Sequence, residues 1–170
     1  AQQYAPKQSE KIPTPAASEK AKSEPSKNAD NRSVVVKISA AARSMLEEMC
    51  IYLPMIPELA VSVLACARIG AIHSVVFAGF SATALSTRIN DCDAKMIICS
   101  DGSYRGAKTI DLKGIVDEAL EDCPGVSSVL VAKRINSDIT MKKGRDEWLQ
   151  PLLDEAYREF TAEVMDAEDP

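Results

Sequence analysis

A chain of 170 residues is long enough for one domain with a sizeable core, and 46% hydrophobic with 26% charged residues is typical of a globular protein. The formal net charge of −5 is uneven, because residues 1–32 are weakly basic and the remainder is acidic. Nucleic-acid backbones are bound by clustered positive charge, so this balance argues against nucleic acid as a partner.

The cysteines and the apolar runs further restrict the class of protein to which this chain can belong. No two cysteines form a C-x-x-C pair, and the single histidine, His73, supplies no Cys/His set for zinc. The cysteines lie in apolar segments, which is typical of reduced, buried thiols. No apolar run approaches the roughly 20 residues of a membrane span. The sequence therefore predicts a cytoplasmic protein without a zinc site or a membrane partner.

The N-terminal region differs from the rest. Residues 1–32 hold four of the nine prolines, with Tyr4 and Ile12 as their only large apolar side chains. Such a stretch cannot bury enough surface to offset its ordering entropy, so we predict a disordered tail, with a docking tail or linker as the alternative. Residues 33–49 give only weak signals, for a strand over 34–38 and a helix over 40–49.

Regular patterns begin at residue 50. Residues 50–55 (CIYLPM) predict a strand, and Pro57 suits the first helical turn, where its missing N–H needs no partner. That helix is apolar on nearly every face as far as Ile69, so we expect it to be buried. Gly70 follows as a C-terminal cap. The apolar run 73–79 predicts a strand covered on both sides.

The alternation continues along the chain. The predicted elements that follow are, in order, a helix capped by Ser81, a strand at 95–100, a helix capped by Asp111, a strand at 127–134 and a helix from Pro151 to Glu159. Strands alternating with helices of about three turns predict a parallel sheet. The fold class is therefore α/β, a flavodoxin-like or Rossmann-like layer in the order β-α-β-α-β-α-β.

Two loops at the carboxyl ends of these strands are candidate binding elements, because sheets of this kind bind ligands there. In residues 77–81 (FAGFS), Gly79 would let backbone approach a ligand, although simple chain turning is the favoured explanation from the residues alone. In residues 100–108, Arg105 and Lys108 could jointly hold a phosphate. Two solvated surface charges are the alternative there, and a slightly favoured one.

Well-known fingerprints are absent. Neither G-x-G-x-x-G nor G-x-x-x-x-G-K-[ST] occurs, which argues against a dinucleotide-binding dehydrogenase and a P-loop enzyme. No Ser/His/Asp set can be assembled, since His73 leads into a strand and is most simply structural. Composition and spacing thus indicate an α/β domain with one candidate phosphate loop.

A resemblance extends this interpretation. Residues 51–126, above all LACARIGAIHSVVFAGFS and YRGAKTIDLK, resemble AMP-forming acetyl-CoA synthetases, which belong to the acyl-adenylate-forming superfamily. The likeness is weaker through KKGRDEW and strong again in AEVMDAEDP, so it covers roughly residues 51–170. It implies that residues 50–170 form part of the large domain of such an enzyme.

The resemblance also implies a chemistry. In this family acetate and ATP give acetyl-adenylate and pyrophosphate with magnesium, and CoA then displaces AMP. Arg105 and Lys108 match basic positions that meet the 3′-phosphate of CoA, although Lys108 is often Arg in relatives. Gly79 matches a glycine along the pantetheine tunnel. CoA is therefore the expected cofactor, with ATP and magnesium implied for the whole enzyme.

The departures from the family pattern limit the activity that we expect of this chain. The chain ends at Pro170, before the Thr/Ser/Gly-rich loop that grips the ATP phosphates in relatives, and residues before 50 do not match. We expect an acetate–CoA ligase fragment that keeps part of the CoA surface, has no assigned catalytic residue and is inactive alone. The alternatives are a non-catalytic CoA-binding or interaction module and, more weakly, a generic nucleotide-binding domain.

Overall fold

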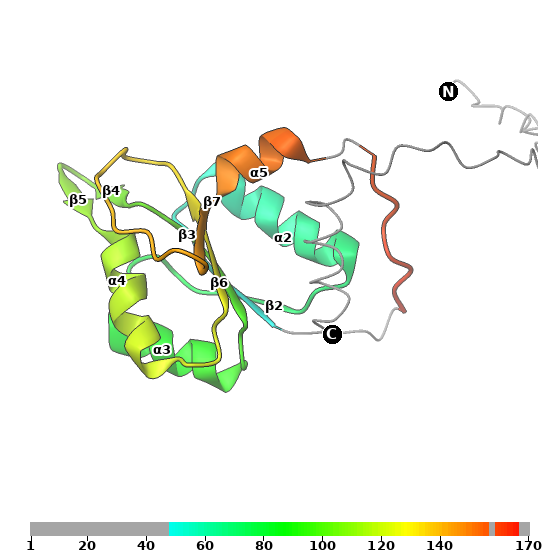
Figure 1. The fold of residues 1–170 in the computed structure, drawn as a ribbon, viewed down its shortest axis with the longest axis horizontal. Helices are drawn as coiled ribbons and strands as arrows, with labels where there is room; N and C mark the ends of the chain where they lie inside the picture. Colours follow the sequence, from blue (N-terminus) through cyan, green and yellow to red (C-terminus); the bar gives the residue numbers. More distant parts are fainter. Residues whose placement is uncertain (1–47, 157–158, 167–170) are drawn as a thin grey trace, which may run out of the picture.

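The sheet is the centre of the molecule. The computed structural model describes residues 48–156 and 159–166, and its helices cover both faces of a five-stranded sheet (Figure 1). The strands are β1 (Met49–Tyr52), β2 (His73–Val75), β3 (Met96–Ser100), β6 (Ser128–Ala132) and β7 (Asp146–Trp148). The predicted tail over 1–32, the weak strand over 34–38 and all but the end of the weak helix over 40–49 lie outside the described residues.

The strand order confirms the predicted fold class. The sheet runs β2-β1-β3-β6-β7 with every neighbouring pair parallel. This is the flavodoxin-like order, in which the chain leaves β1 first toward one edge and then toward the other. The change of direction opens a crevice outside the carboxyl ends of β1 and β3, which is where such sheets bind ligands.

In the described part of the chain, two helices pack on each face of the sheet. Helices α2 (Pro57–Ile69) and α5 (Leu149–Glu155) lie on one face, and α3 (Ala82–Asp91) and α4 (Leu112–Ala119) lie on the other (Figure 1). Alternate strand residues supply the two cores, since Cys50 and Tyr52 pack toward α3 and α4 while Ile51 packs toward α2. The sheet is therefore buried on both faces.

The predicted helix ends are confirmed. Gly70 ends α2 with a φ of 69°, a conformation that glycine adopts without a steric penalty. The Ser81 hydroxyl accepts a hydrogen bond from the Ala84 N–H at 3.3 Å, and the Asp111 carboxylate accepts one from the Gly114 N–H at 2.8 Å. Short-range signals in the sequence thus set where these helices begin or end.

Two burial predictions were wrong. Helix α2 is not buried, because Val61 is 54% exposed and Leu64 is 64% exposed, whereas the polar Ser62 is buried. The run 73–79 forms a strand only over 73–75, at the edge of the sheet, and Phe77 is 67% exposed. An apolar run forms a covered strand only where other elements surround it, and among the described residues β2 pairs with β1 alone.

Several elements differ from the sequence-based expectation. The loop after β3 contains a hairpin of β4 (Ser103–Arg105) and β5 (Lys108–Ile110), and β7 was not predicted. Helix α5 begins at Leu149, before Pro151, and ends at Glu155 rather than Glu159. Met49 belongs to β1 and not to a helix.

The cysteines are free thiols, as predicted, and four of the five are buried. Burial raises the pKa of Cys66 to about 11 and, with nearby thiols, that of Cys50 to about 12, so neither ionises near neutral pH. Over 48–156 and 159–166, no helix has the length and apolar content needed to cross a membrane.

Candidate functional site

A pocket of about 290 Å³ opens at the carboxyl ends of β1 and β3. One wall is apolar and comes from the loops after β1 and β2, while the hairpin and the end of β6 supply polar and basic groups. The lining residues are Pro54, Met55, Ile56, Phe77, Ala78, Gly79, Ser103, Tyr104, Arg105, Ile110 and Arg134. The pocket lies where a sheet of this strand order binds ligands, and it combines an apolar surface with two guanidinium groups.

The hairpin brings the two predicted cations together. Arg105 and Lys108 are paired across the turn in the β4–β5 register, so their side chains share one face of the hairpin. Gly106 in the turn has a φ of 61°. Within the described part of the chain, neither side chain has an ion-pair partner, so both are available to an anion. Arg105 lines the pocket and Lys108 does not.

Gly79 lies in the pocket wall beneath an aromatic ring. Its N–H donates to the Phe77 carbonyl at 2.8 Å, and a Cβ added to it would lie 2.4 Å from the Phe77 ring. A larger residue would push that exposed ring outward and change the wall. The residue after it, Phe80, is held by the core, because the hydroxyl of the buried Tyr52 donates to the Phe80 carbonyl at 2.8 Å. Gly79 thus both turns the chain and contributes backbone to the pocket surface.

Arg134 is a pocket residue that the sequence analysis missed. It follows β6, whose carboxyl end is next to that of β3, and its guanidinium lies over the Tyr104 ring at 5.8 Å from the centroid. The signal was available, since Arg134 ends the predicted strand 127–134. A search for cations at strand ends would have found it.

Asp101 joins the ends of β3 and β6. Its carboxylate is fully buried and accepts hydrogen bonds from the N–H groups of Gly102 at 2.8 Å, Arg134 at 2.7 Å and Ile135 at 3.1 Å. Backbone N–H donors of this kind satisfy a buried carboxylate. The backbone that carries Arg134 is therefore held in place from inside the protein.

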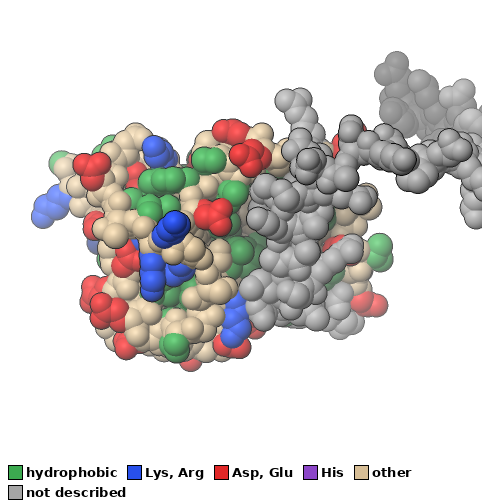
Figure 2. Space-filling view, in the orientation of Figure 1, with side chains coloured by type: hydrophobic (Ala, Val, Ile, Leu, Met, Phe, Trp, Pro, Cys, Tyr) green, Lys and Arg blue, Asp and Glu red, His purple; other side chains and the backbone are tan. Residues whose placement is uncertain are grey.

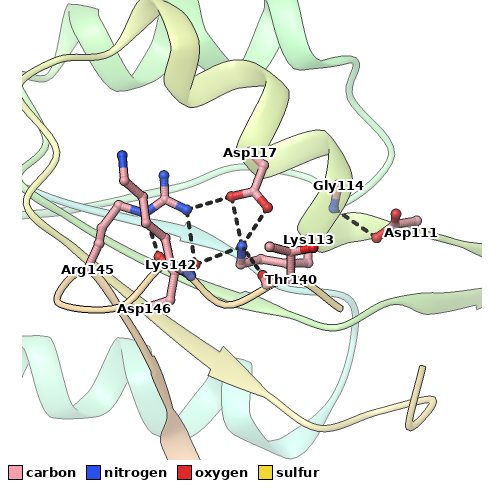
Figure 3. A network of polar contacts seen from close by, with 8 residues as sticks. All are labelled: Asp111, Lys113, Gly114, Asp117, Thr140, Lys142, Arg145 and Asp146. Carbon is pink, nitrogen blue, oxygen red and sulfur yellow. Dashed lines mark hydrogen bonds and ion pairs between the residues drawn. The ribbon is translucent and has the colours of Figure 1, made fainter. Parts of the chain in front are cut away.

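A second charged cluster lies elsewhere, between α4 and the segment before β7 (Figure 3). Lys113 is 1% exposed and contacts Asp117 at 2.7 Å and the fully buried Asp146 carboxylate at 2.9 Å. Arg145 contacts the same two carboxylates, at 2.6 Å in the case of Asp117. The Lys113 ammonium also donates to the Thr140 carbonyl at 3.1 Å. Two cations thus face two anions, and the cluster carries no net charge.

The cluster perturbs the titration of Asp146. Burial by itself would raise the pKa of this carboxyl, but hydrogen bonds from Arg145, the Lys142 N–H and Lys113 outweigh burial and lower the pKa to about 2. Asp146 therefore stays ionised at neutral pH. The cluster holds the chain between β6 and β7 against α4, which is a structural role.

The face of the molecule shown in Figure 2 is mixed in charge. Basic and acidic side chains are interspersed on the face shown in Figure 2, and a basic side chain projects from the hairpin end at left. The residues that the structure describes contain no group of three or more His, Cys, Asp or Glu side chains placed to hold a metal ion. The magnesium implied by the resemblance therefore has no fitting ligand set among them, and we assign no step to it.

Comparisons with known proteins agree with the resemblance seen in the sequence. The family model described as "AMP-binding enzyme" matches residues 46–170. Acetyl-coenzyme A synthetase of Halorhodospira halophila is 52% identical over 124 residues, which are 73% of this chain and 19% of that protein. Acetyl-coenzyme A synthetase 2 of Pseudomonas aeruginosa is 52% identical with the same coverage. The chain thus spans 19% of the length of these curated relatives.

A solved structure shows a similar fold. The acetoacetyl-CoA synthetase from Streptomyces lividans superposes with a TM-score of 0.68 at 23% sequence identity. The match covers 82% of this chain and 22% of that one. At this level of identity the comparison concerns the fold alone.

Proposed function

Since this chain belongs to the AMP-binding enzyme family, we propose that it supplies part of the CoA-binding surface of an AMP-forming acetate–CoA ligase. One observation carries the proposal. A pocket at the ligand-binding edge of the sheet is lined by Gly79 and Arg105, and Lys108 stands beside Arg105 on the same face of the hairpin. These are the three residues that the family resemblance assigns to CoA.

In the whole ligase, acetate and ATP give acetyl-adenylate and pyrophosphate, and the thiol of CoA then attacks the acyl carbon and releases AMP. The part of this chain is to bind and orient CoA. Arg105 can hold the 3′-phosphate with two parallel hydrogen bonds, and Lys108 adds a point charge. Gly79 keeps side-chain bulk out of the wall along which the pantetheine arm would lie. ATP would be bound by parts of the enzyme other than these three residues.

We further propose that the 170-residue polypeptide does not ligate acetate to CoA by itself. It spans 19% of the length of the relatives that carry the name acetyl-coenzyme A synthetase. Acetate-dependent release of AMP and pyrophosphate from ATP by the pure chain would contradict this. The free thiols of its cysteines fit a reducing compartment, so we propose the cytoplasm as its location.

A non-catalytic CoA-binding or interaction module is the second candidate function. The observation that favours it is an apolar groove of about 310 Å³ between α2 and α5, where Val61, Cys66 and Leu153 are among the lining residues. Such a surface could receive another protein. CoA binding by a chain that also forms a stable complex with a full-length synthetase, and that adds no activity to it, would support this candidate.

Isothermal titration calorimetry of CoA into the full 170-residue chain tests the main proposal. We expect binding that weakens about tenfold in the Arg105→Ala variant and more than tenfold with dephospho-CoA, because the variant loses one charge-assisted contact and dephospho-CoA loses those of both Arg105 and Lys108. The matched control is Lys133→Ala, an exposed cation whose ammonium lies over the Trp148 ring and not in the pocket. AMP serves as the ligand control.

The outcomes separate the candidates. No CoA binding by a sample that circular dichroism shows to be folded would overturn the proposed function. Binding of AMP as strong as that of CoA would instead favour a generic nucleotide-binding domain. Equal loss of affinity in Arg105→Ala and Lys133→Ala would mean that the effect is one of general charge and not of a built phosphate site.

A further inference from the structure

A different basic side chain lies on each side of the β4–β5 hairpin. Successive residues of a strand point to opposite faces, so Tyr104 lies on the other side of the hairpin from Arg105 and Lys108. The Arg134 guanidinium lies over the Tyr104 ring, at 5.8 Å from its centroid. Arg105 and Arg134 both line the same pocket. The pocket therefore has two basic positions that the hairpin strand separates.

Arg134 is held in a way that suits binding. Its N–H is fixed by the buried Asp101 carboxylate at 2.7 Å, while its side chain is exposed and has no carboxylate partner among the residues described. The surroundings are tight, because a Cβ on Gly102 would lie 2.4 Å from the Ile135 side chain and 2.7 Å from the Ile110 carbonyl. The base of the hairpin and the end of β6 thus form one packed unit that presents a cation.

We propose that Arg134 binds the diphosphate of CoA, while Arg105 and Lys108 bind its 3′-phosphate; this inference rests on the proposed function. CoA carries these two phosphate groups at separate positions, and the pocket offers cations at two separate positions. A guanidinium pairs with phosphate oxygens through parallel N–H donors. Stacking on Tyr104 limits the rotation of the Arg134 side chain before a ligand arrives, which lowers the entropy cost of binding.

Dephospho-CoA separates the two sites, because it keeps the diphosphate and lacks the 3′-phosphate. Calorimetric titrations of the full chain would compare CoA with dephospho-CoA in Arg105→Ala, Arg134→Ala and Lys133→Ala. We expect Arg134→Ala to bind both ligands about tenfold more weakly than wild type. We expect Arg105→Ala to bind CoA about tenfold more weakly and dephospho-CoA as wild type does. Lys133→Ala, one residue from Arg134, should leave both affinities unchanged.

Further variants keep the test decisive. Arg134→Gln retains a planar polar group without the charge, and it should reproduce the loss seen in Arg134→Ala if the charge is what matters. Arg134→Lys keeps the charge without the planar fork and should recover part of the affinity. Thermal unfolding of each variant identifies any that fails to fold, and the conclusion then rests on the remaining Arg134 variants.

The results that overturn the inference differ from those that overturn the proposed function. Wild-type affinity in the Arg134 variants, with a loss in Arg105→Ala, would refute only the role of Arg134. A loss in Arg134→Ala that is confined to CoA would assign Arg134 to the 3′-phosphate and refute the diphosphate assignment. No CoA binding by the folded wild-type chain would overturn the proposed function, and this inference with it.

Discussion

The charge cluster beside α4 and the pocket at the hairpin both contain basic side chains, but these side chains have opposite surroundings in the two places. In the cluster, Lys113 and Arg145 are matched by two carboxylates and are largely removed from water. In the pocket, Arg105 and Arg134 are exposed, and no carboxylate pairs with either in the part of the chain that the structure describes. Matched and buried charges hold the protein together, whereas exposed and unmatched ones are available to a ligand.

Breaking the cluster should give the largest effect on stability. Asp146→Asn removes one of two carboxylates and leaves a buried lysine with one anionic partner, so we expect the free energy of unfolding to fall by about 3 kcal/mol. Urea denaturation followed by circular dichroism measures this change. The matched control, Asp154→Asn, alters an exposed carboxylate that accepts a hydrogen bond from the Gln150 side chain at 2.8 Å. Equal effects of the two substitutions would show that the cluster does not stabilise the fold.

The dependence of stability on acid pH tests separately whether the ionised Asp146 carboxylate stabilises the fold. The pKa of Asp146 is lowered in the folded state from an ordinary 3.8 to about 2. Folding therefore favours the ionised form, and this stabilisation is complete above about pH 4 and is lost as the pH falls toward 2. We expect the wild type to lose about 2 kcal/mol more than Asp146→Asn over this interval. If the free energy of unfolding fell equally with pH in the two proteins, the lowered pKa of Asp146 would be contradicted.

Tyr52 connects the core to the pocket and should give an intermediate effect. Tyr52→Phe removes the hydrogen bond to the Phe80 carbonyl, so we expect a loss of about 1 kcal/mol in stability together with weaker CoA binding. Denaturation and calorimetry measure the two changes. Tyr104→Phe is the control for stability, because that ring is 57% exposed. Unchanged CoA affinity in Tyr52→Phe would mean that the loop before α3 does not depend on this anchor.

The smallest change in stability is expected at the hairpin. Lys108→Ala removes an exposed charge, so the free energy of unfolding should change by less than about 0.5 kcal/mol. The affinity for CoA should still fall severalfold, because a phosphate contact is lost. Lys143→Ala, another exposed lysine, should change neither quantity. A stability loss in Lys108→Ala above 1 kcal/mol would place this residue with the structural charges instead.

The sequence predicted what local signals determine. The caps at Ser81 and Asp111 and the left-handed Gly70 act within a few residues, and the alternation of strands and helices repeats at short range. The pairing of Arg105 with Lys108 was also accessible, because the two flank a glycine turn. The functional roles of these two residues and of Gly79 remain proposals.

Features that depend on distant partners could not be predicted in this way. Strand β7 holds only three residues with charged side chains at two of them, and it becomes a strand because β6 offers its edge. The charge cluster joins Lys113 to Asp146 across a long stretch of chain, so neither residue signals the other. The exposure of α2 depends on what surrounds the helix, which composition does not specify.

The parallel pairing of the five-stranded sheet has a consequence for folding kinetics. Because every pairing in the five-stranded sheet is parallel, no two of its strands can be joined by a tight turn, and each contact closes a long loop. Chains with such contacts fold slowly, since loop entropy is lost before the contacts form. We expect refolding on the millisecond-to-second scale, with α4 and the short hairpin forming before the parallel strands pair.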